Sequence, residues 1–94
     1  MEIDRSSLIV SKAARDKGQL FYVVDTDDQY VYLADGKSRK LEKPKRKKRK
    51  HVQAAFQTES RIAEKIRNGE KVLNSELRKE LASLGQKQSQ NQGG

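Results

Sequence analysis

Two short apolar runs joined by a charged loop constrain the fold of this chain more than any other stretch. The runs are 8–10 (Leu-Ile-Val) and 20–24 (Leu-Phe-Tyr-Val-Val), and the loop between them ends in Gly18. β-Branched and aromatic residues favour strands, and glycine takes the positive φ that is needed where a loop re-enters a strand. The stretch 8–25 therefore predicts a β-hairpin.

The loop of this hairpin carries three cations, Lys12, Arg15 and Lys17. A loop held on two rigid strands is a common position for binding residues. The same cations would also suit an ordinary solvated turn. The residues of the loop by themselves leave both interpretations open.

The segment after the hairpin predicts a third strand. Residues 25–28 (Asp-Thr-Asp-Asp) are turn formers, because their side chains compete for backbone hydrogen bonds. In the alternation that follows, Val31 and Leu33 share one face, and Tyr30 and Tyr32 share the other. These two tyrosines either cover the sheet or offer stacking surfaces to nucleic-acid bases.

A fourth strand is predicted to pair back after the turn dipeptide 35–36 (Asp-Gly). It would comprise 37–42 with Leu41 directed inward, and Pro44 would end it or lie on an edge. A short strand at 51–53 would close the sheet. Four or five short strands with tight turns indicate a small, strongly bent barrel. The expected core residues are Val10, Phe21, Val23, Val31, Leu33 and Leu41. Tyr22 is expected to cover the barrel rim, with a stacking surface for bases as the alternative.

Composition limits the size and the compartment of such a domain. With 94 residues, of which 33% are hydrophobic, the chain has room for one small domain and an appendage. It contains no cysteine, which excludes disulfides and thiolate metal sites and suits a reducing compartment. Neither a signal peptide nor an apolar run of membrane-spanning length is visible. We therefore expect a soluble, cytoplasmic protein with no membrane partner.

The positive charge of the chain is concentrated in one segment. The net charge is +8, and ten of the 21 Lys and Arg residues lie between Lys37 and Lys50, where Glu42 is the only acid. The rest of the chain is nearly neutral. This asymmetry indicates a polyanionic partner.

The densest part of this segment, 43–50, has seven cations in eight positions. Their mutual repulsion would be relieved by phosphates, and binding would release condensed counterions. Arginine adds forked, planar contacts to phosphate, whereas lysine adds a mobile point charge. The same segment would serve as a nuclear import signal in a eukaryote. A membrane-surface anchor is the weaker alternative, because no lipidation signal or apolar anchor accompanies it.

The residue types that support catalysis or metal binding are few. His51 is the only histidine, and without cysteine or nearby clustered carboxylates it does not build a metal site from this chain alone. We expect it to contact a base or phosphate, or to occupy an ordinary strand position. No nucleotide-binding glycine loop or nucleophile elbow occurs, and the pair 27–28 (Asp-Asp) fits a turn better than a catalytic dyad. We expect no enzyme activity and no cofactor.

After residue 55 the pattern becomes helical. Residues 58–60 (Thr-Glu-Ser) provide an N-cap, and Ile62, Ala63 and Ile66 follow at helical spacing until 68–69 (Asn-Gly). Two short helices are not stable alone, so they should pack on each other, on the barrel or on a partner.

A second helix is predicted to start at 74–76 (Asn-Ser-Glu) and to end at Gly85. A satellite core is the favoured role of its apolar stripe, ahead of a partner-binding groove or a self-association surface. The stripe consists of Leu73, Leu77, Leu81 and Leu84. Residues 86–94 have no apolar side chain and are predicted to be disordered. The expected division is a barrel with its basic stretch at 1–55, a helical extension at 56–85 and a tail at 86–94.

The loop 11–18 (Ser-Lys-Ala-Ala-Arg-Asp-Lys-Gly) and the alternating strand after it resemble a KOW motif. The stretches 34–45 and 50–53 are similar to those of small bacterial KOW-domain RNA-binding proteins, which are related to a ribosomal protein family of the L-fourteen-e type. The resemblance covers most of residues 3–55 and implies an SH3-like barrel that binds RNA. This chain has Ala14 where we expect glycine in the family.

Together these observations predict a mainly β fold with C-terminal helices and a noncatalytic RNA-binding role in translation. Docking on ribosomal RNA would use the hairpin loop for shape and the basic stretch for affinity. The expected RNA-binding residues are Lys12, Arg15, Lys17, Lys37, Arg39, Lys40, Lys43, Lys45, Arg46, Lys47, Lys48, Arg49, Lys50 and His51. The alternative is a protein-interaction adaptor that uses the barrel and the leucine-striped helices, with the basic stretch as a targeting signal.

Overall fold

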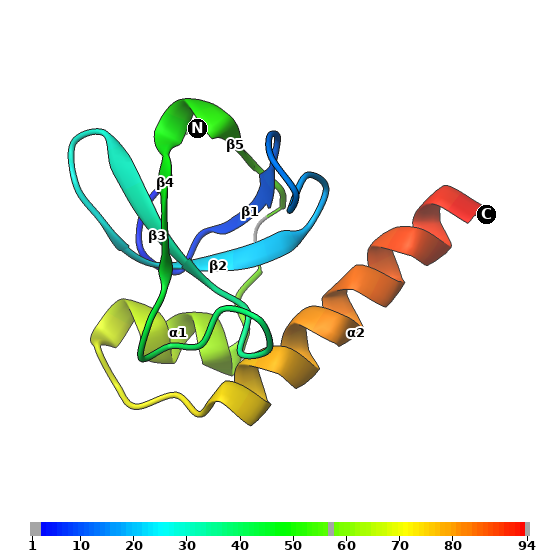
Figure 1. Ribbon diagram of the computed structural model, residues 1–94. Coiled ribbons are helices and arrows are strands. Elements are labelled where there is room, and N and C mark those ends of the chain that lie inside the picture. Colours follow the sequence, from blue (N-terminus) through cyan, green and yellow to red (C-terminus); the bar gives the residue numbers. More distant parts are fainter. Residues whose placement is uncertain (1–2, 57, 94) are drawn as a thin grey trace.

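The computed structural model describes residues 3–56 and 58–93 of the 94-residue chain (Figure 1). It contains a five-stranded antiparallel sheet followed by two helices. The strands are β1 Leu8–Ser11, β2 Leu20–Thr26, β3 Tyr30–Ala34, β4 Lys45–Lys48 and β5 Val52–Ala54. A 3-10 helix, η1 Arg49–His51, joins β4 to β5. The sheet order is β4-β3-β2-β1-β5, and the strongly curved sheet forms a small barrel-like fold.

The first hairpin is confirmed. In β1 and β2, Leu8 lies opposite Tyr22 and Val10 lies opposite Leu20. Gly18 has a φ of +88°, the left-handed conformation that the end of the loop requires. The loop is closed by a hydrogen bond from the backbone N–H of Gly18 to the carbonyl of Ser11, 2.8 Å long.

The predicted fourth strand at 37–42 is wrong, because these residues form a loop and β4 begins only at Lys45. The carboxylate of Asp35 accepts the backbone N–H groups of Lys37 and Arg39 at 2.9 and 2.8 Å. Donors that are bonded to a side chain are not free to join a strand ladder. Pro44 directly precedes β4, which is an edge strand.

The apolar residues divide into two clusters. Inside the curved sheet lie Ile9, Phe21, Val23, Val31, Leu33 and Val52. On its outer side, Leu8, Tyr22 and Ala34 pack against the helical residues Ile62, Ala63, Ile66, Leu77 and Leu81. Strands covered on both faces lose the simple alternation of apolar and polar residues.

These clusters confirm Phe21, Val23, Val31 and Leu33 as core residues and correct the other two. Val10 is only half-buried, because Ile9 takes the inner position on β1. Leu41 is half-buried and packs on the outer cluster. The run Leu8-Ile9-Val10 is apolar throughout, so the sequence pattern did not distinguish the inner face from the outer one.

The two helices are α1 Arg61–Asn68 and α2 Asn74–Gly93, and both begin where the sequence predicts. Ser60 caps α1 by accepting the backbone N–H of Ala63 at 3.1 Å. The predicted satellite core is confirmed, because Leu77 and Leu81 are buried. Leu73 is 50% exposed and lies outside this core.

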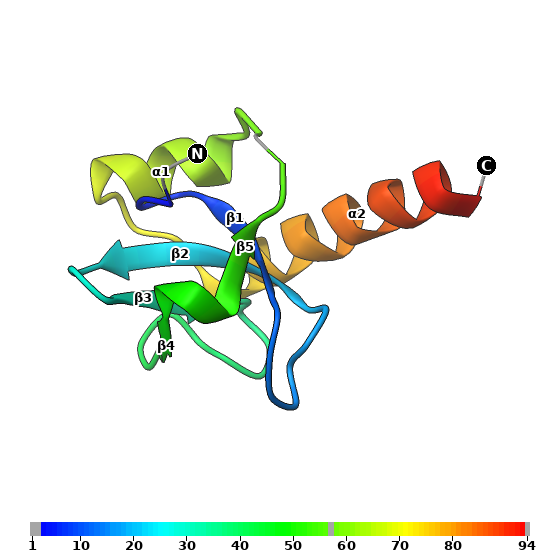
Figure 2. The ribbon, with the colours of Figure 1, turned by 90° about the horizontal axis from the view of Figure 1, so that it is seen from above.

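α2 extends away from the barrel toward the C-terminus (Figure 1, Figure 2). The sequence predicts disorder from residue 86, whereas in the structure α2 continues to Gly93 and Gly94 lies outside the described residues. The first turns of α2 are packed on the rest of the fold, so the unfavourable nucleation of the helix is already overcome. Each residue added after that gains one backbone hydrogen bond. Glutamine and lysine in this segment have fair helix propensity, so apolar contacts are not needed to continue it.

Tyr22 joins the sheet to both helices. Its ring is fully buried under the helices rather than at the barrel rim, and its hydroxyl bonds the Glu80 carboxylate on α2 and lies 3.1 Å from the Ser60 hydroxyl at the start of α1. Burial and the neighbouring Glu80 raise the pKa of Tyr22 well above its usual value. Tyr22 is therefore a packing residue, as the sequence favours, and it is not a platform for bases.

The loop between β3 and β4 rests on the first turn of α2. The side chain of Asn74 accepts the backbone N–H of Leu41 at 2.8 Å and donates to both carboxylate oxygens of Glu42. Gly36 has a φ of +76° and lies so close to α2 that an added Cβ would overlap the backbone carbonyl oxygen of Asn74. The first turn of α2 therefore holds the shape of a loop that carries several of the predicted RNA-binding cations.

Substituting Gly36→Ala should separate this loop from α2. We expect the free energy of unfolding to fall by about 3 kcal/mol or more, because backbone strain and overlap act together. Gly69→Ala is the matched control, because Gly69 has a φ of +73° and open space around its Cβ position. This control should lose only about 1–2 kcal/mol. Urea unfolding measures both, and equal losses would contradict the proposed close packing.

Candidate nucleic-acid interface

The basic segment is an edge strand whose cations alternate between two faces. β4 pairs with β3 so that Lys45 lies opposite Leu33 and Lys47 opposite Val31, which are core residues. Lys47 is accordingly buried, at 7% exposure. The intervening Arg46 and Lys48 are exposed on the other face.

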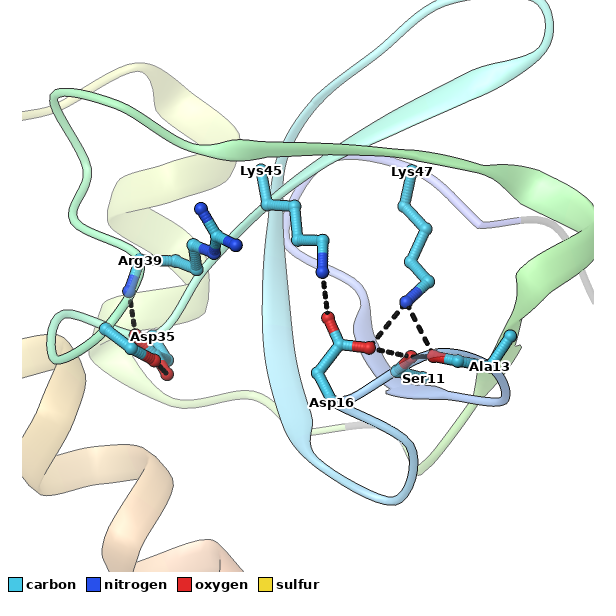
Figure 3. A network of polar contacts seen from close by, with 8 residues as sticks. Ser11, Ala13, Asp16, Asp35, Arg39, Lys45 and Lys47 are labelled. Carbon is cyan, nitrogen blue, oxygen red and sulfur yellow. Dashed lines mark hydrogen bonds and ion pairs between the residues drawn. The ribbon is translucent and has the colours of Figure 1, made fainter.

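Both inward lysines bind one carboxylate, that of Asp16 in the first hairpin loop (Figure 3). Asp16 accepts the ammonium of Lys45 at 2.6 Å and that of Lys47 at 2.5 Å. It also accepts the hydroxyl of Ser11 at 2.6 Å, and the Lys47 ammonium donates a further bond to the carbonyl of Ala13 at 2.9 Å. We name this group the Asp16 cluster; it joins β4 to the loop between β1 and β2.

The electrostatics of the cluster favour an ionised Asp16. Burial opposes ionisation, but the hydrogen bonds from Lys45, Lys47 and Ser11 outweigh it and hold the pKa of Asp16 well below its usual range. The Asp16 side chain is 10% exposed and that of Lys47 is 6% exposed. The pair is therefore a buried ion pair with further hydrogen bonds, which is the arrangement that offsets the cost of desolvation.

Arg49 is also occupied by contacts within the chain. Its guanidinium donates to the carbonyl of Ile3 at 2.8 Å and to the carbonyl of Asp27 at 3.1 Å. The segment 43–50 is thus not a uniform ribbon of free charge, because Lys45, Lys47 and Arg49 have partners in the fold.

The other predicted cations lie on the surface. The exposed members of the predicted set are Lys12, Arg15, Lys17, Lys37, Arg39, Lys40, Lys43, Arg46, Lys48 and Lys50. His51 is half-buried in η1, and its carbonyl accepts the backbone N–H of Lys12 at 2.8 Å. This bond places the start of the hairpin loop beside the end of the basic segment.

Three of the predicted cations meet around one open pocket of about 430 Å³. Arg15 comes from the β1–β2 loop, Arg39 from the β3–β4 loop and Lys45 from β4. The one carboxylate in the lining is Asp16, which is already bound by two lysines. We name this site the cationic pocket; its lining is Arg15, Asp16, Gln19, Phe21, Ser38, Arg39 and Lys45.

The cationic pocket suits a phosphate group. Two arginines supply forked donors and Gln19 adds a neutral amide donor. Lys45 adds positive charge beside its bond to Asp16, and the hydroxyl of Ser38 donates to the Asp35 carboxylate at 3.1 Å. Gln19 and Ser38 are not among the residues predicted from the sequence. Nothing in their local pattern marks them, since two loops far apart in the chain bring them together.

The shape of the hairpin loop includes one strained residue. Ala14 has a φ of +68°, the left-handed conformation in which a Cβ is unfavourable. It occupies the position at which the resemblance to KOW proteins leads us to expect glycine. Glycine adopts this conformation without strain, whereas alanine does not.

Comparison of the sequence with models of protein families and with curated proteins gives no match. The resemblance to KOW proteins therefore stays a prediction. In residues 3–56 and 58–93 there is no helix with the length and apolar character needed to cross a membrane. Within the same residues no cluster of metal-binding side chains occurs.

The Asp16 cluster predicts a specific dependence of stability on pH. The pKa of Asp16 is lower in the folded state than in the unfolded state, so its contribution is present above about pH 4 and is lost as the pH falls further. Asp16→Asn should lower the free energy of unfolding at pH 7 by about 3 kcal/mol, because Lys47 stays buried without its carboxylate.

Urea unfolding at pH 7 and at pH 3 measures both effects. Asp16→Asn should lose less stability than the wild type between these two pH values, whereas the exposed-site control Asp28→Asn should follow the wild type. Identical pH dependence in wild type and Asp16→Asn would contradict the role of this cluster.

Relief of the strain at Ala14 should stabilise the protein. Ala14→Gly should raise the free energy of unfolding by about 0.5–1 kcal/mol, because relief of the left-handed conformation exceeds the added entropy of the unfolded chain. The neighbouring control Ala13→Gly should lower stability by about 0.5–1 kcal/mol, since Ala13 is not left-handed. Thermal unfolding of both variants measures this difference, and a loss in both would refute it.

Proposed function

We propose that this chain is a noncatalytic RNA-binding protein that acts in translation and docks on ribosomal RNA. The observation that carries the proposal is the meeting of Arg15, Arg39 and Lys45 around one open pocket, although they come from three separate segments. Eight further cations of the predicted set are exposed, two of which, Arg46 and Lys48, lie on the other face of β4. A surface of this kind matches a chain of phosphates better than a small anion.

The proposal includes an SH3-like barrel of the KOW type. The strand order β4-β3-β2-β1-β5 and the 3-10 helix before β5 support this assignment. So does the first hairpin, whose charged loop ends in the left-handed Gly18. In this assignment the hairpin loop is the docking element, and the Asp16 cluster fixes its position relative to β4.

Binding would be dominated by phosphate contacts. Such contacts set the position of a protein on RNA but carry little sequence information, so recognition would depend mainly on RNA shape. If the exposed cations engage about five to eight phosphates, the logarithm of affinity should fall with the logarithm of salt concentration at a slope near −4 to −6.

The adaptor alternative is less well supported. It depends on the leucine stripe of α2 as a binding surface, yet Leu77 and Leu81 are buried against the sheet and α1. Use of the basic segment as an import signal is also disfavoured, because Lys47 is buried and Lys45–Lys48 is a strand paired with β3. These contacts favour RNA binding as the use of the positive surface.

The proposal is tested by removing two cations from the pocket. Arg15→Gln with Arg39→Gln should weaken binding to ribosomal RNA about tenfold or more, and the salt slope should become shallower by about 1.5, as expected for two lost phosphate contacts. Filter binding over a range of salt concentrations measures both quantities.

The matched control removes the same charge elsewhere. Arg61→Gln with Arg67→Gln changes two exposed arginines of α1 and should leave affinity within about threefold of wild type, the residual effect of net charge alone. Equal losses of affinity in the two double variants would mean that the pocket contributes only through the net charge of the protein. A wild-type slope near zero would refute RNA binding through phosphates.

A further inference from the structure

The outer face of β3 and β4 carries a second group of side chains, which the cationic pocket does not use. Tyr32 lies opposite Arg46, and Tyr30 lies opposite Lys48. The guanidinium of Arg46 stacks over the ring of Tyr30, 4.6 Å from its centroid. We name these four residues the outer patch.

The aromatic residues of the outer patch do not belong to the core. Tyr30 and Tyr32 are half-buried, and neither is a member of the two apolar clusters. Both arise from the face of β3 opposite to Val31 and Leu33, which fill the barrel. Core packing therefore does not require aromatic side chains at these two positions.

Both tyrosines of the outer patch are hydrogen-bonded to one carboxylate, that of Asp27. The hydroxyl of Tyr32 donates to the Asp27 carboxylate at 2.9 Å, and the backbone N–H of Tyr30 donates to the same carboxylate at 2.9 Å. The hydrogen bond from the Tyr30 backbone, followed in size by that from the Tyr32 hydroxyl, holds the pKa of Asp27 below its usual range. The same bond to Asp27 raises the pKa of Tyr32. Asp27 thus stays ionised and Tyr32 stays a neutral donor near neutral pH.

The chemistry of this arrangement suits an unpaired base. Bases stack on aromatic rings and on arginine guanidinium planes, and such stacking tolerates different base identities. The guanidinium of Arg46 lies over the Tyr30 ring, and the Arg46 side chain is exposed to solvent. Lys48, which lies opposite Tyr30, supplies a positive charge for a phosphate. The Asp27 carboxylate already accepts hydrogen bonds from both tyrosines.

We propose that the outer patch binds an unpaired base of single-stranded RNA, stacked on the Arg46 guanidinium, with the adjoining phosphate at Lys48. This inference rests on the proposed function and specifies its substrate as RNA that contains unpaired nucleotides. β4 is an edge strand, with Lys45 at the cationic pocket and the next residue, Arg46, on the outer face. One RNA strand that crosses this edge reaches both sites.

The test compares two ligands that differ only in their bases. One is a fluorescein-labelled single-stranded RNA oligonucleotide of mixed sequence, and the other is an abasic oligonucleotide with the same number of phosphates. By fluorescence anisotropy the wild type should bind the first about 5- to 100-fold more tightly than the second, the gain expected from stacking of a base.

Arg46→Lys separates stacking from charge, because lysine keeps the positive charge but lacks the planar guanidinium. This variant should reduce the preference for the base-bearing ligand to less than about twofold and leave the salt slope unchanged. Arg61→Lys makes the same chemical change at an exposed residue of α1 that belongs to neither site and should keep the wild-type preference. Circular dichroism of both variants checks that the fold is retained.

The outcomes distinguish this inference from the function on which it rests. An unchanged preference in Arg46→Lys, or equal binding of the two ligands by the wild type, overturns base stacking at the outer patch while leaving phosphate binding in place. If the wild type binds neither ligand in dilute buffer, both the proposed function and this inference are overturned.

Discussion

The position of β4 relative to the β1–β2 loop depends on the bonds between Asp16 and the two inward lysines of β4. A strand of four cations, Lys45–Lys48, would otherwise place two ammonium groups next to the apolar interior. Asp16 offsets this cost because both lysines share its carboxylate, and Ser11 and Ala13 complete the hydrogen bonding. Inward-pointing charges also protect an edge strand from pairing with other chains.

This cluster has a consequence for the surface. Because alternate residues of β4 point inward, the outward residues Arg46 and Lys48 are separated from Lys45 by the thickness of the sheet. The positive charge of β4 is therefore divided between the cationic pocket and the outer patch. A single dense run of cations in the sequence becomes two sites with different neighbours, one lined by loops and one by tyrosines.

The helices contribute to the same surface from a distance. Asn74 at the start of α2 bonds the backbone of Leu41 and the side chain of Glu42, and Gly36 allows close approach of the two segments. This contact gives the β3–β4 loop a defined path, and with it the position of Arg39 at the pocket. The helical extension thus shapes the proposed RNA-binding surface as well as completing the outer apolar cluster.

The sequence alone determined the features that depend on local chemistry: the first hairpin with its left-handed Gly18, the third strand, and both helix starts. It misplaced the fourth strand and two core residues, because Asp35 takes the backbone donors of 37–42 and helices cover the outer face of the sheet. Only the tertiary structure decided which cations are free. Arg46 and Lys47 are adjacent and carry the same charge, but only Lys47 is bound by Asp16. Asp16 lies in the β1–β2 loop, and no local sequence pattern connects that loop to β4.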